Sequence, residues 1–163
     1  MRYFILSLFL IISVLIANGQ KKEPRFQRSD IELGLGTAFG ANNYYYKHGG
    51  AGPYFRMEYR YNLKVVPLDL GFQLAVSGLK HVRDDDDSNS VDTEFLVSNY
   101  HFFKTTNVDL YAGVGLGLVN VEEYFGSSMR IGAKLFKHLN FSLEYKFLYK
   151  EDAHAVASLG FYF

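Results

Sequence analysis

The sequence predicts an all-β fold: an eight-stranded antiparallel up-and-down β-barrel that spans a membrane and follows a cleavable signal peptide. Three observations predict it. The 163-residue chain opens with an apolar leader. Behind the leader, hydrophobic residues recur at every second position in eight segments separated by turn residues, which is the period of a β-strand. Glycines gather on the charged face of these segments, and a solvent-exposed sheet gives no reason for that.

Residues 1–19 have the layout of a secretory signal peptide. One positive charge precedes an apolar run over residues 4–16, and a small-residue tripeptide follows at 17–19. The run has about 13 residues, whereas a helix that spans a bilayer needs about 20. We therefore predict cleavage directly after the tripeptide, a short periplasmic segment at 20–30 and a barrel over 31–163.

The eight predicted strands are recognised by alternation. In the third of them, leucine, phenylalanine and valine occupy the even positions, and aspartate, glycine, glutamine, alanine and serine occupy the odd ones. In seven strands one face carries no charge, so we expect that face to contact lipid and the other to line the lumen. The predicted strands are 31–39, 53–62, 68–77, 92–103, 108–118, 128–136, 139–149 and 153–163.

The fourth strand has no clean phase. Placing its odd residues outward exposes Phe95 and Val97 to lipid together with an asparagine, whereas the even phase places Glu94 in lipid. A β-bulge near Val97-Ser98 would turn Phe95 and Val97, and then Tyr100 and Phe102, outward. We adopt that bulge, which keeps Glu94 in the lumen.

The charged face predicts a polar network inside the barrel. An eight-stranded barrel is only wide enough for its own side chains to fill. We therefore expect these charges to pair with one another and to plug the lumen, and a continuous ion path lined by the same groups is the alternative. The predicted network comprises six acids and five bases: Glu32, Glu58, Asp69, Glu94, Asp109, Glu144, Arg56, Arg60, Arg130, Lys134 and Lys146.

The connections between the strands are of two kinds. Short turns on the periplasmic side and longer extracellular loops are typical of outer-membrane barrels. The longer, more polar connections are 40–52, 78–91 and 119–127, the shorter ones are 63–67, 104–107 and 137–138, and 150–152 is short where the pattern expects a long one. Tyrosines with Asn and Gly are typical of adaptable binding surfaces, and an acidic run is typical of a solvated loop. The predicted contact residues are Tyr44, Tyr45, Tyr46, Asp84, Asp85, Asp86 and Asp87.

The whole mature chain resembles the small outer-membrane barrels of the OmpA-transmembrane-domain and OmpX type. It is also similar to the broad, porin-like group described as the outer membrane protein beta-barrel domain. Besides the leader and the eight segments, the residues that carry this resemblance are Gly34-Leu35-Gly36, Gly113-Val114-Gly115-Leu116-Gly117 and Phe161-Tyr162-Phe163. The resemblance implies a Gram-negative cell outer membrane, lipid and lipopolysaccharide as neighbours, and Phe161 and Phe163 as a signal read by the barrel-assembly machinery.

Composition excludes several functions. Lys and Arg number 17 against 17 Asp and Glu, a balance that argues against a nucleic-acid binder. The absence of Cys excludes disulfides, Cys-ligated metals and thiol catalysis. The five His show no metal-ligand spacing, and the run at 84–87 lacks the glycine and glutamate of an EF-hand. We therefore interpret this run as a solvated loop, and loose binding of divalent cations is the alternative.

No catalytic arrangement emerges either. The His-x-Ser pair of barrel lipid deacylases is absent, and His154 and Ser158 lie about 13 Å apart along one strand. We therefore expect no enzyme, no cofactor and no metal. The predicted protein is a monomer with a structural or surface-interaction role through its extracellular loops, and a small porin-like channel is the alternative.

Overall fold

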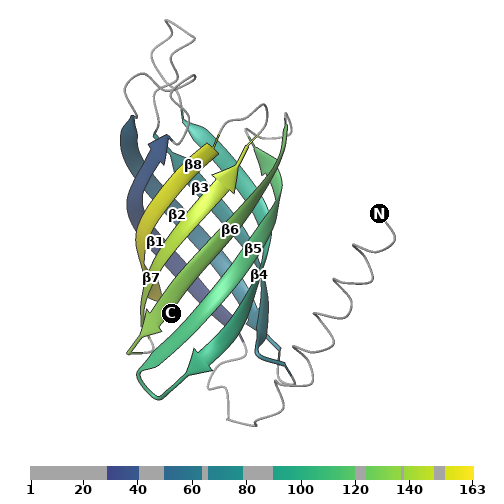
Figure 1. The fold of residues 1–163 in the computed structure, drawn as a ribbon, viewed down its shortest axis with the longest axis vertical. Helices are drawn as coiled ribbons and strands as arrows, with labels where there is room; N and C mark the ends of the chain where they lie inside the picture. The colour runs from purple at the N-terminus through teal and green to yellow at the C-terminus, as the bar shows by residue number, and fades with distance from the viewer. Residues whose placement is uncertain are drawn as a thin grey trace, which may run out of the picture.

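The structure, a computed structural model, describes residues 29–40, 50–63, 66–78, 90–119, 124–136, 138–148 and 153–163. Its strands form one closed barrel in which each strand pairs antiparallel with its neighbours in sequence and β1 pairs with β8 (Figure 1). The strands are β1 (Ser29–Gly40), β2 (Ala51–Asn62), β3 (Leu68–Ser77), β4 (Val91–Lys104), β5 (Val108–Val119), β6 (Tyr124–Leu135), β7 (Leu139–Phe147) and β8 (Ala153–Tyr162). The predicted eight-stranded antiparallel barrel is thus confirmed.

The described part of the chain contains no helix with the length and apolarity needed to cross a membrane. The predicted leader at 1–19 lies outside the described residues, so its cleavage stays a prediction.

One strand boundary differs enough from its prediction to change the loops. β6 begins at Tyr124, which pairs with Val119, and Phe125 next to it pairs with Leu118. The connection between β5 and β6 is therefore only 120–123, and the prediction of a longer loop over 119–127 is wrong. Phe125, which is 65% exposed, continues the outer face of β6 beyond Ser127, and its cross-strand pair with Leu118 extends the hairpin.

The outer face of the barrel is apolar, as the alternation predicts. Leu35, near the middle of β1, is 68% exposed, whereas Glu32 on the other face of the same strand is 0% exposed. The exposed residues on the remaining strands include Phe55, Phe72, Leu96, Val114, Ile131, Phe141 and Leu159. An apolar outer band around a closed sheet is the surface that a lipid bilayer requires, because no backbone edge is left unpaired.

β4 corrects the predicted phase. Phe95 and Val97 are buried in the lumen, whereas Leu96 is exposed on the outer face, so no bulge lies at 97–98. The register against β5 runs without a break to His101 and shifts only between His101 and Phe103. The predicted exposure of Phe95 and Val97 to lipid is therefore wrong.

The same phase moves Glu94 out of the lumen. Glu94 pairs with Leu74 on β3 and Leu118 on β5, both of which face outward. It lies near the first residue of β4, where the apolar band ends and a carboxylate costs little free energy. The inward position next to it is filled by the ring of Phe95, for which Gly115 and Gly126 leave room: a Cβ there would lie 3.1 and 3.2 Å from ring atoms.

Candidate functional site

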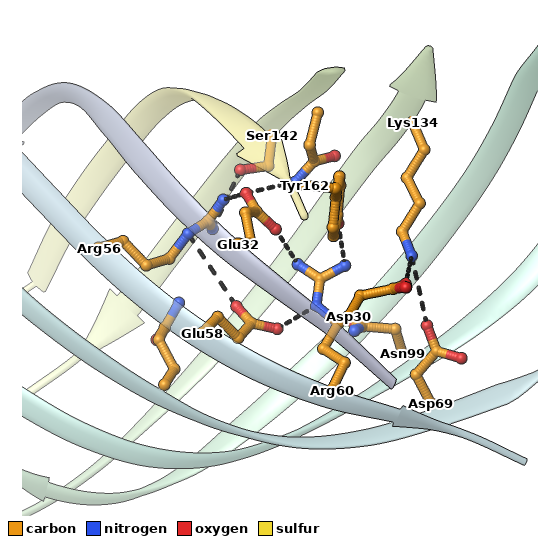
Figure 2. A network of polar contacts seen from close by, with 12 residues as sticks. Asp30, Glu32, Arg56, Glu58, Arg60, Asp69, Asn99, Lys134, Ser142 and Tyr162 are labelled. Atoms are coloured by element: carbon orange, nitrogen blue, oxygen red, sulfur yellow. Dashed lines mark hydrogen bonds and ion pairs between the residues drawn. The ribbon is translucent and has the colours of Figure 1, made fainter. Parts of the chain in front are cut away.

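The centre of the lumen holds a buried ion network of two glutamates and three arginines, of which Figure 2 shows Glu32, Glu58, Arg56 and Arg60. Arg130 Nη1 and Nη2 donate to the two carboxylate oxygens of Glu58 at 2.5 and 2.7 Å, a bidentate pair. Arg60 Nη2 donates to Glu32 Oε2 at 2.6 Å, and Arg60 also pairs with Glu58. Arg56 pairs with Glu32 as well. Three strands, β1, β2 and β6, are therefore tied together across the lumen.

Neutral side chains from other strands make further hydrogen bonds to this network. Asn140 on β7 donates to Glu32 Oε1 at 2.9 Å, and Arg130 Nε donates to Asn99 Oδ1 on β4 at 2.7 Å. Ser142 Oγ accepts from Arg56 at 3.2 Å, and the Tyr162 hydroxyl of β8 accepts from Arg60. A buried ion network stabilises a fold only when its members are hydrogen-bonded in this way.

A second cluster lies at the end of the barrel that carries the C-terminus. His101 bridges two carboxylates, with Nε2 at 2.5 Å from Asp69 Oδ2 and Nδ1 at 2.6 Å from Asp109 Oδ1. Lys134 Nζ lies 3.2 Å from Asp30 Oδ2 and 3.8 Å from Asp69 Oδ2. His101 was not among the predicted lumen residues, because the predicted network counted only Asp, Glu, Lys and Arg, although the bulge assumed in the fourth strand also places His101 on the inner face.

The opposite half of the lumen, towards the loops, is less polar. Glu144 Oε2 accepts from Gln73 Nε2 at 3.3 Å and lies 3.5 Å from the hydroxyl of Tyr54. Lys146 Nζ donates to Thr93 Oγ1 at 2.8 Å. The rest of this wall includes a buried apolar cluster of Val91, Phe95, Val97 and Val119.

Glycines on the inner face make room for these long side chains. A Cβ at Gly132 would overlap the ring of Tyr111, and a Cβ at Gly160 would overlap the carboxylate of Glu32. The hydroxyl of Tyr111 in turn donates to Asn140 at 3.1 Å, within the central network. The glycines of the charged face therefore have a packing role inside the lumen, which a solvent-exposed sheet would not give them.

The structure places most of the predicted site residues. Of the eleven predicted lumen residues, ten lie on the inner face and Glu94 lies on the outer face. Phe161 and Phe163 lie exposed at the end opposite the loops, and the ring of Phe161 stacks on His138 with centroids 5.7 Å apart. The predicted contact residues at 44–46 and 84–87 lie outside the described residues.

Metal binding finds no support in the described part of the chain, where no group of three or more His, Asp or Glu side chains could hold a metal ion. What the lumen can do chemically is to hold charge in fixed pairs.

Comparison with known proteins shows the fold. No protein-family model matches the sequence, and no curated protein matches it. The Neisserial surface protein A structure superposes with a TM-score of 0.62 at 13% identity, over 83% of this chain and 96% of that one. Ail, the attachment invasion locus protein of Yersinia pestis, gives 0.52 at 17% identity, over 83% and 97%. A de novo designed transmembrane β-barrel gives 0.55 at 8% identity, over 86% and 100%.

The general class, a small eight-stranded outer-membrane barrel, is confirmed by this fold. A closed antiparallel barrel with an apolar outer band and longer connections at one end is the architecture of outer-membrane proteins. The chain is therefore a transmembrane β-barrel of the outer membrane. Its narrower likeness to the OmpA and OmpX type stays a prediction.

Proposed function

We propose that the protein is a monomeric outer-membrane barrel that acts as a structural or surface-interaction protein through the loops of its extracellular end. The observation that carries the proposal is the occupied lumen. Arg56, Glu58 and Arg60 are each 0% exposed and lie in the central ion network. A function carried by the lumen would have to break these pairs, and leaving a buried charge without its partner costs about 3–5 kcal/mol.

The loop-bearing end is the remaining candidate for function. The connections over 41–50 and 78–90 join β1 to β2 and β3 to β4 at this end, and both are longer than the turns at the other end. A rigid barrel that carries variable loops is a common way to present contact residues. The tyrosines at 44–46 and the aspartates at 84–87 are the residues we propose for contacts with an extracellular partner, and with divalent cations beside lipopolysaccharide.

Two of the similar structures have names that agree with this proposal. One is a surface protein and the other an attachment invasion locus protein. At 13% and 17% identity the likeness extends to the fold and not to a ligand. The alternative, a small porin-like channel, has no comparable support, because the charged groups at the centre of the lumen, which would line its path, are paired with one another.

Cell adhesion tests the proposal. Cells that display the protein are compared with cells that display a Tyr44→Ser, Tyr45→Ser, Tyr46→Ser variant, on surfaces coated with extracellular-matrix glycoproteins and glycans. We expect adhesion above that of cells lacking the protein, and its loss in the triple variant at an equal amount of folded barrel. Glu94→Gln, which changes a charge on the outer face of the barrel, is the matched control and should adhere normally. Adhesion that is absent, or unchanged in the triple variant, would contradict the proposal.

Assembly is tested separately. We propose that Phe161 and Phe163 form the signal for the barrel-assembly machinery, and deletion of Phe163 should then reduce the fraction of folded barrel in the outer-membrane fraction. The supporting geometry is that both rings lie exposed at the end of the last strand, with their centroids 5.2 Å apart. Unaltered membrane insertion of the deletion variant would count against this role.

A further inference from the structure

We propose that the end of the barrel that carries the C-terminus is held together by a proton-dependent latch, in which His101 joins Asp69 to Asp109 with both of its ring nitrogens protonated. The latch goes beyond the surface-interaction role proposed above, because it lies at the opposite end of the barrel from the loops. Three features of the described residues lead to it: the hydrogen-bonding geometry of the histidine, the charges around it, and an interruption of the sheet beside it.

Both ring nitrogens of His101 lie against carboxylate oxygens. Nε2 is 2.5 Å from Asp69 Oδ2, and Nδ1 is 2.6 Å from Asp109 Oδ1. An ionised carboxylate only accepts hydrogen bonds, and a neutral imidazole has one N–H donor and one acceptor nitrogen. A neutral ring would therefore place a lone pair against one of the two carboxylates, whereas an imidazolium donates to both. An imidazole takes up a proton more readily than a carboxylate does, so the extra proton lies on the histidine.

The charges around the histidine also call for a protonated ring. Lys104 on the same strand lies 3.5 Å from Asp109 Oδ2. Lys134 on β6 lies 3.2 Å from Asp30 Oδ2 on β1 and 3.8 Å from Asp69 Oδ2 (Figure 2). Three carboxylates thus face two lysines, and a charged histidine makes the cluster neutral. A neutral histidine would leave the cluster with a net negative charge inside the barrel, which is costly.

The other titratable groups near the latch do not replace this charge. The ring centroid of Tyr111 on β5 is 5.7 Å from that of His101. Arg60 on β2 lies over the same tyrosine ring, 5.3 Å from its centroid, and is paired within the central ion network. The ring of Tyr162 on β8 lies 4.4 Å from Lys134 Nζ. A phenol is uncharged near neutral pH, so the positive charge in direct contact with the two aspartates comes from the histidine and the two lysines.

The latch spans an interruption of the sheet. His101 pairs with Tyr111, but Phe103 pairs with Leu110, so the register between β4 and β5 skips one residue. A bulge of this kind disrupts the hydrogen-bond ladder locally. Asp109 lies beyond the bulge and His101 before it, so their contact joins the two sides. The contact with Asp69 extends the connection to β3. Side chains therefore join three strands where the backbone ladder is interrupted.

Water reaches this end of the lumen, so protons can exchange with the latch. The side chain of Lys104 is 41% exposed and that of Asp109 is 11% exposed. The folded barrel keeps a proton on His101 at a pH where the unfolded chain has released it. The free energy of unfolding therefore falls as the pH rises. The contribution is complete where the histidine of the unfolded chain is also charged, and it is lost once the folded barrel releases the proton too.

Nitrogen-15 NMR of the histidine rings tests the protonation state directly. The full mature chain is folded in detergent micelles with labelled histidine, and the signals that disappear in His101→Gln identify His101. At about pH 7.5, where an ordinary histidine is mostly neutral, we expect both ring nitrogens of His101 to carry hydrogen and to have the similar shifts of an imidazolium. Two widely separated shifts, one for a protonated and one for an unprotonated nitrogen, would overturn the proposal.

Unfolding in urea between about pH 6 and pH 8.5 gives the second readout. One linked proton changes the unfolding equilibrium constant by at most about tenfold per pH unit. Over this range we expect the constant of the unchanged protein to rise about tenfold more than that of His101→Gln. His138→Gln is the matched control, because His138 is exposed at the same end and stacks on Phe161. It should keep the pH dependence of the unchanged protein, and an equal dependence in His101→Gln would contradict the latch.

Asp109→Asn is the second variant, used if His101→Gln does not fold. An amide can donate to the acceptor nitrogen of a neutral ring, so this variant satisfies His101 without the extra proton and should also lose the pH dependence. Hydrogen exchange then locates the change. After correction for the intrinsic effect of pH on exchange, protection in the unchanged protein should fall at residues 104–111 more than at 112–118. An equal loss of protection along the whole of β5 would refute a local latch.

Discussion

Replacing Glu58 by glutamine removes one negative charge from the centre of the lumen and changes almost nothing else in size. In the structure the two oxygens of Glu58 accept a bidentate pair from Arg130, and Arg60 pairs with the same carboxylate. Arg60 keeps Glu32 as an acidic partner after the change, but Arg130 keeps only the side-chain amide of Asn99.

The magnitude follows from the loss of the acidic partner that the buried Arg130 has among the described residues. Breaking a buried ion pair on one side costs about 3–5 kcal/mol. Because glutamine still offers one acceptor oxygen to Arg130, we expect the free energy of unfolding to fall by about 3 kcal/mol, the lower end of that range. Glu58→Gln combined with Arg130→Met removes both charges and should recover more than about 1 kcal/mol of that loss, since directly contacting residues couple.

Equilibrium unfolding in urea from lipid vesicles provides the assay. The chain has no tryptophan and 13 tyrosines, so far-ultraviolet circular dichroism or tyrosine fluorescence reports the folded fraction. Glu94→Gln is the matched control, because the same chemical change at the edge of the outer face should alter stability by less than about 0.5 kcal/mol. Equal losses in the two variants would refute the assignment of Glu58 to the lumen and Glu94 to the outer face.

Three further outcomes follow from the same geometry. Gly132→Ala places a methyl group into the ring of Tyr111 and should cost about 1–3 kcal/mol, whereas Gly50→Ala, with open space around it, should change stability little; equal effects in unfolding titrations would contradict the packing role of Gly132. Leu35→Arg puts a charge at the middle of the lipid face and should cost about 2–4 kcal/mol in the same titrations, against about 0–1 for Phe125→Arg near the end of β6. Because the chain has no cysteine, a fluorophore on Leu96→Cys should be quenched by spin-labelled lipid and one on Phe95→Cys should not; the reverse result would restore the original phase of the fourth strand.

Alternation predicted the fold because seven strands have one face without charge. In a barrel every strand contacts lipid on one side, so the period-two pattern survives in each strand separately and needs no knowledge of the partners. The same reasoning placed Glu32, Arg56 and Glu144 in the lumen, where the structure has them buried.

Alternation gave the wrong inward and outward phase for the fourth strand, partly because of residues in other strands. Phe95 and Val97 are apolar and face inward because Gly115 and, for Phe95, Gly126 leave space against them. Glu94 is charged and faces outward because it lies near the end of the strand, where the apolar band stops. The first cause lies in β5 and β6, and the second depends on where the apolar band of the barrel ends. The alternation within residues 92–103 therefore could not reveal the phase.

The pairing inside the lumen was also beyond the sequence. Glu58 and Arg130 are 72 positions apart, and Asn140 is 108 positions from Glu32. Their contacts depend on the register of the strands around the closed barrel, which alternation does not specify. The inventory of charges was therefore predictable, but its division into a central network, a His101 cluster and a loop-side group with Glu144 and Lys146 was not.

Planar-bilayer recording of the purified mature protein tests the central claim, that the lumen is closed by paired charges and that the function lies in the loops. We predict inserted protein, verified by its folded mobility on gels, with no steady single-channel openings across the voltage range that the bilayer tolerates. Steady openings of uniform conductance from the unchanged protein would contradict the closed lumen and would favour the small channel instead.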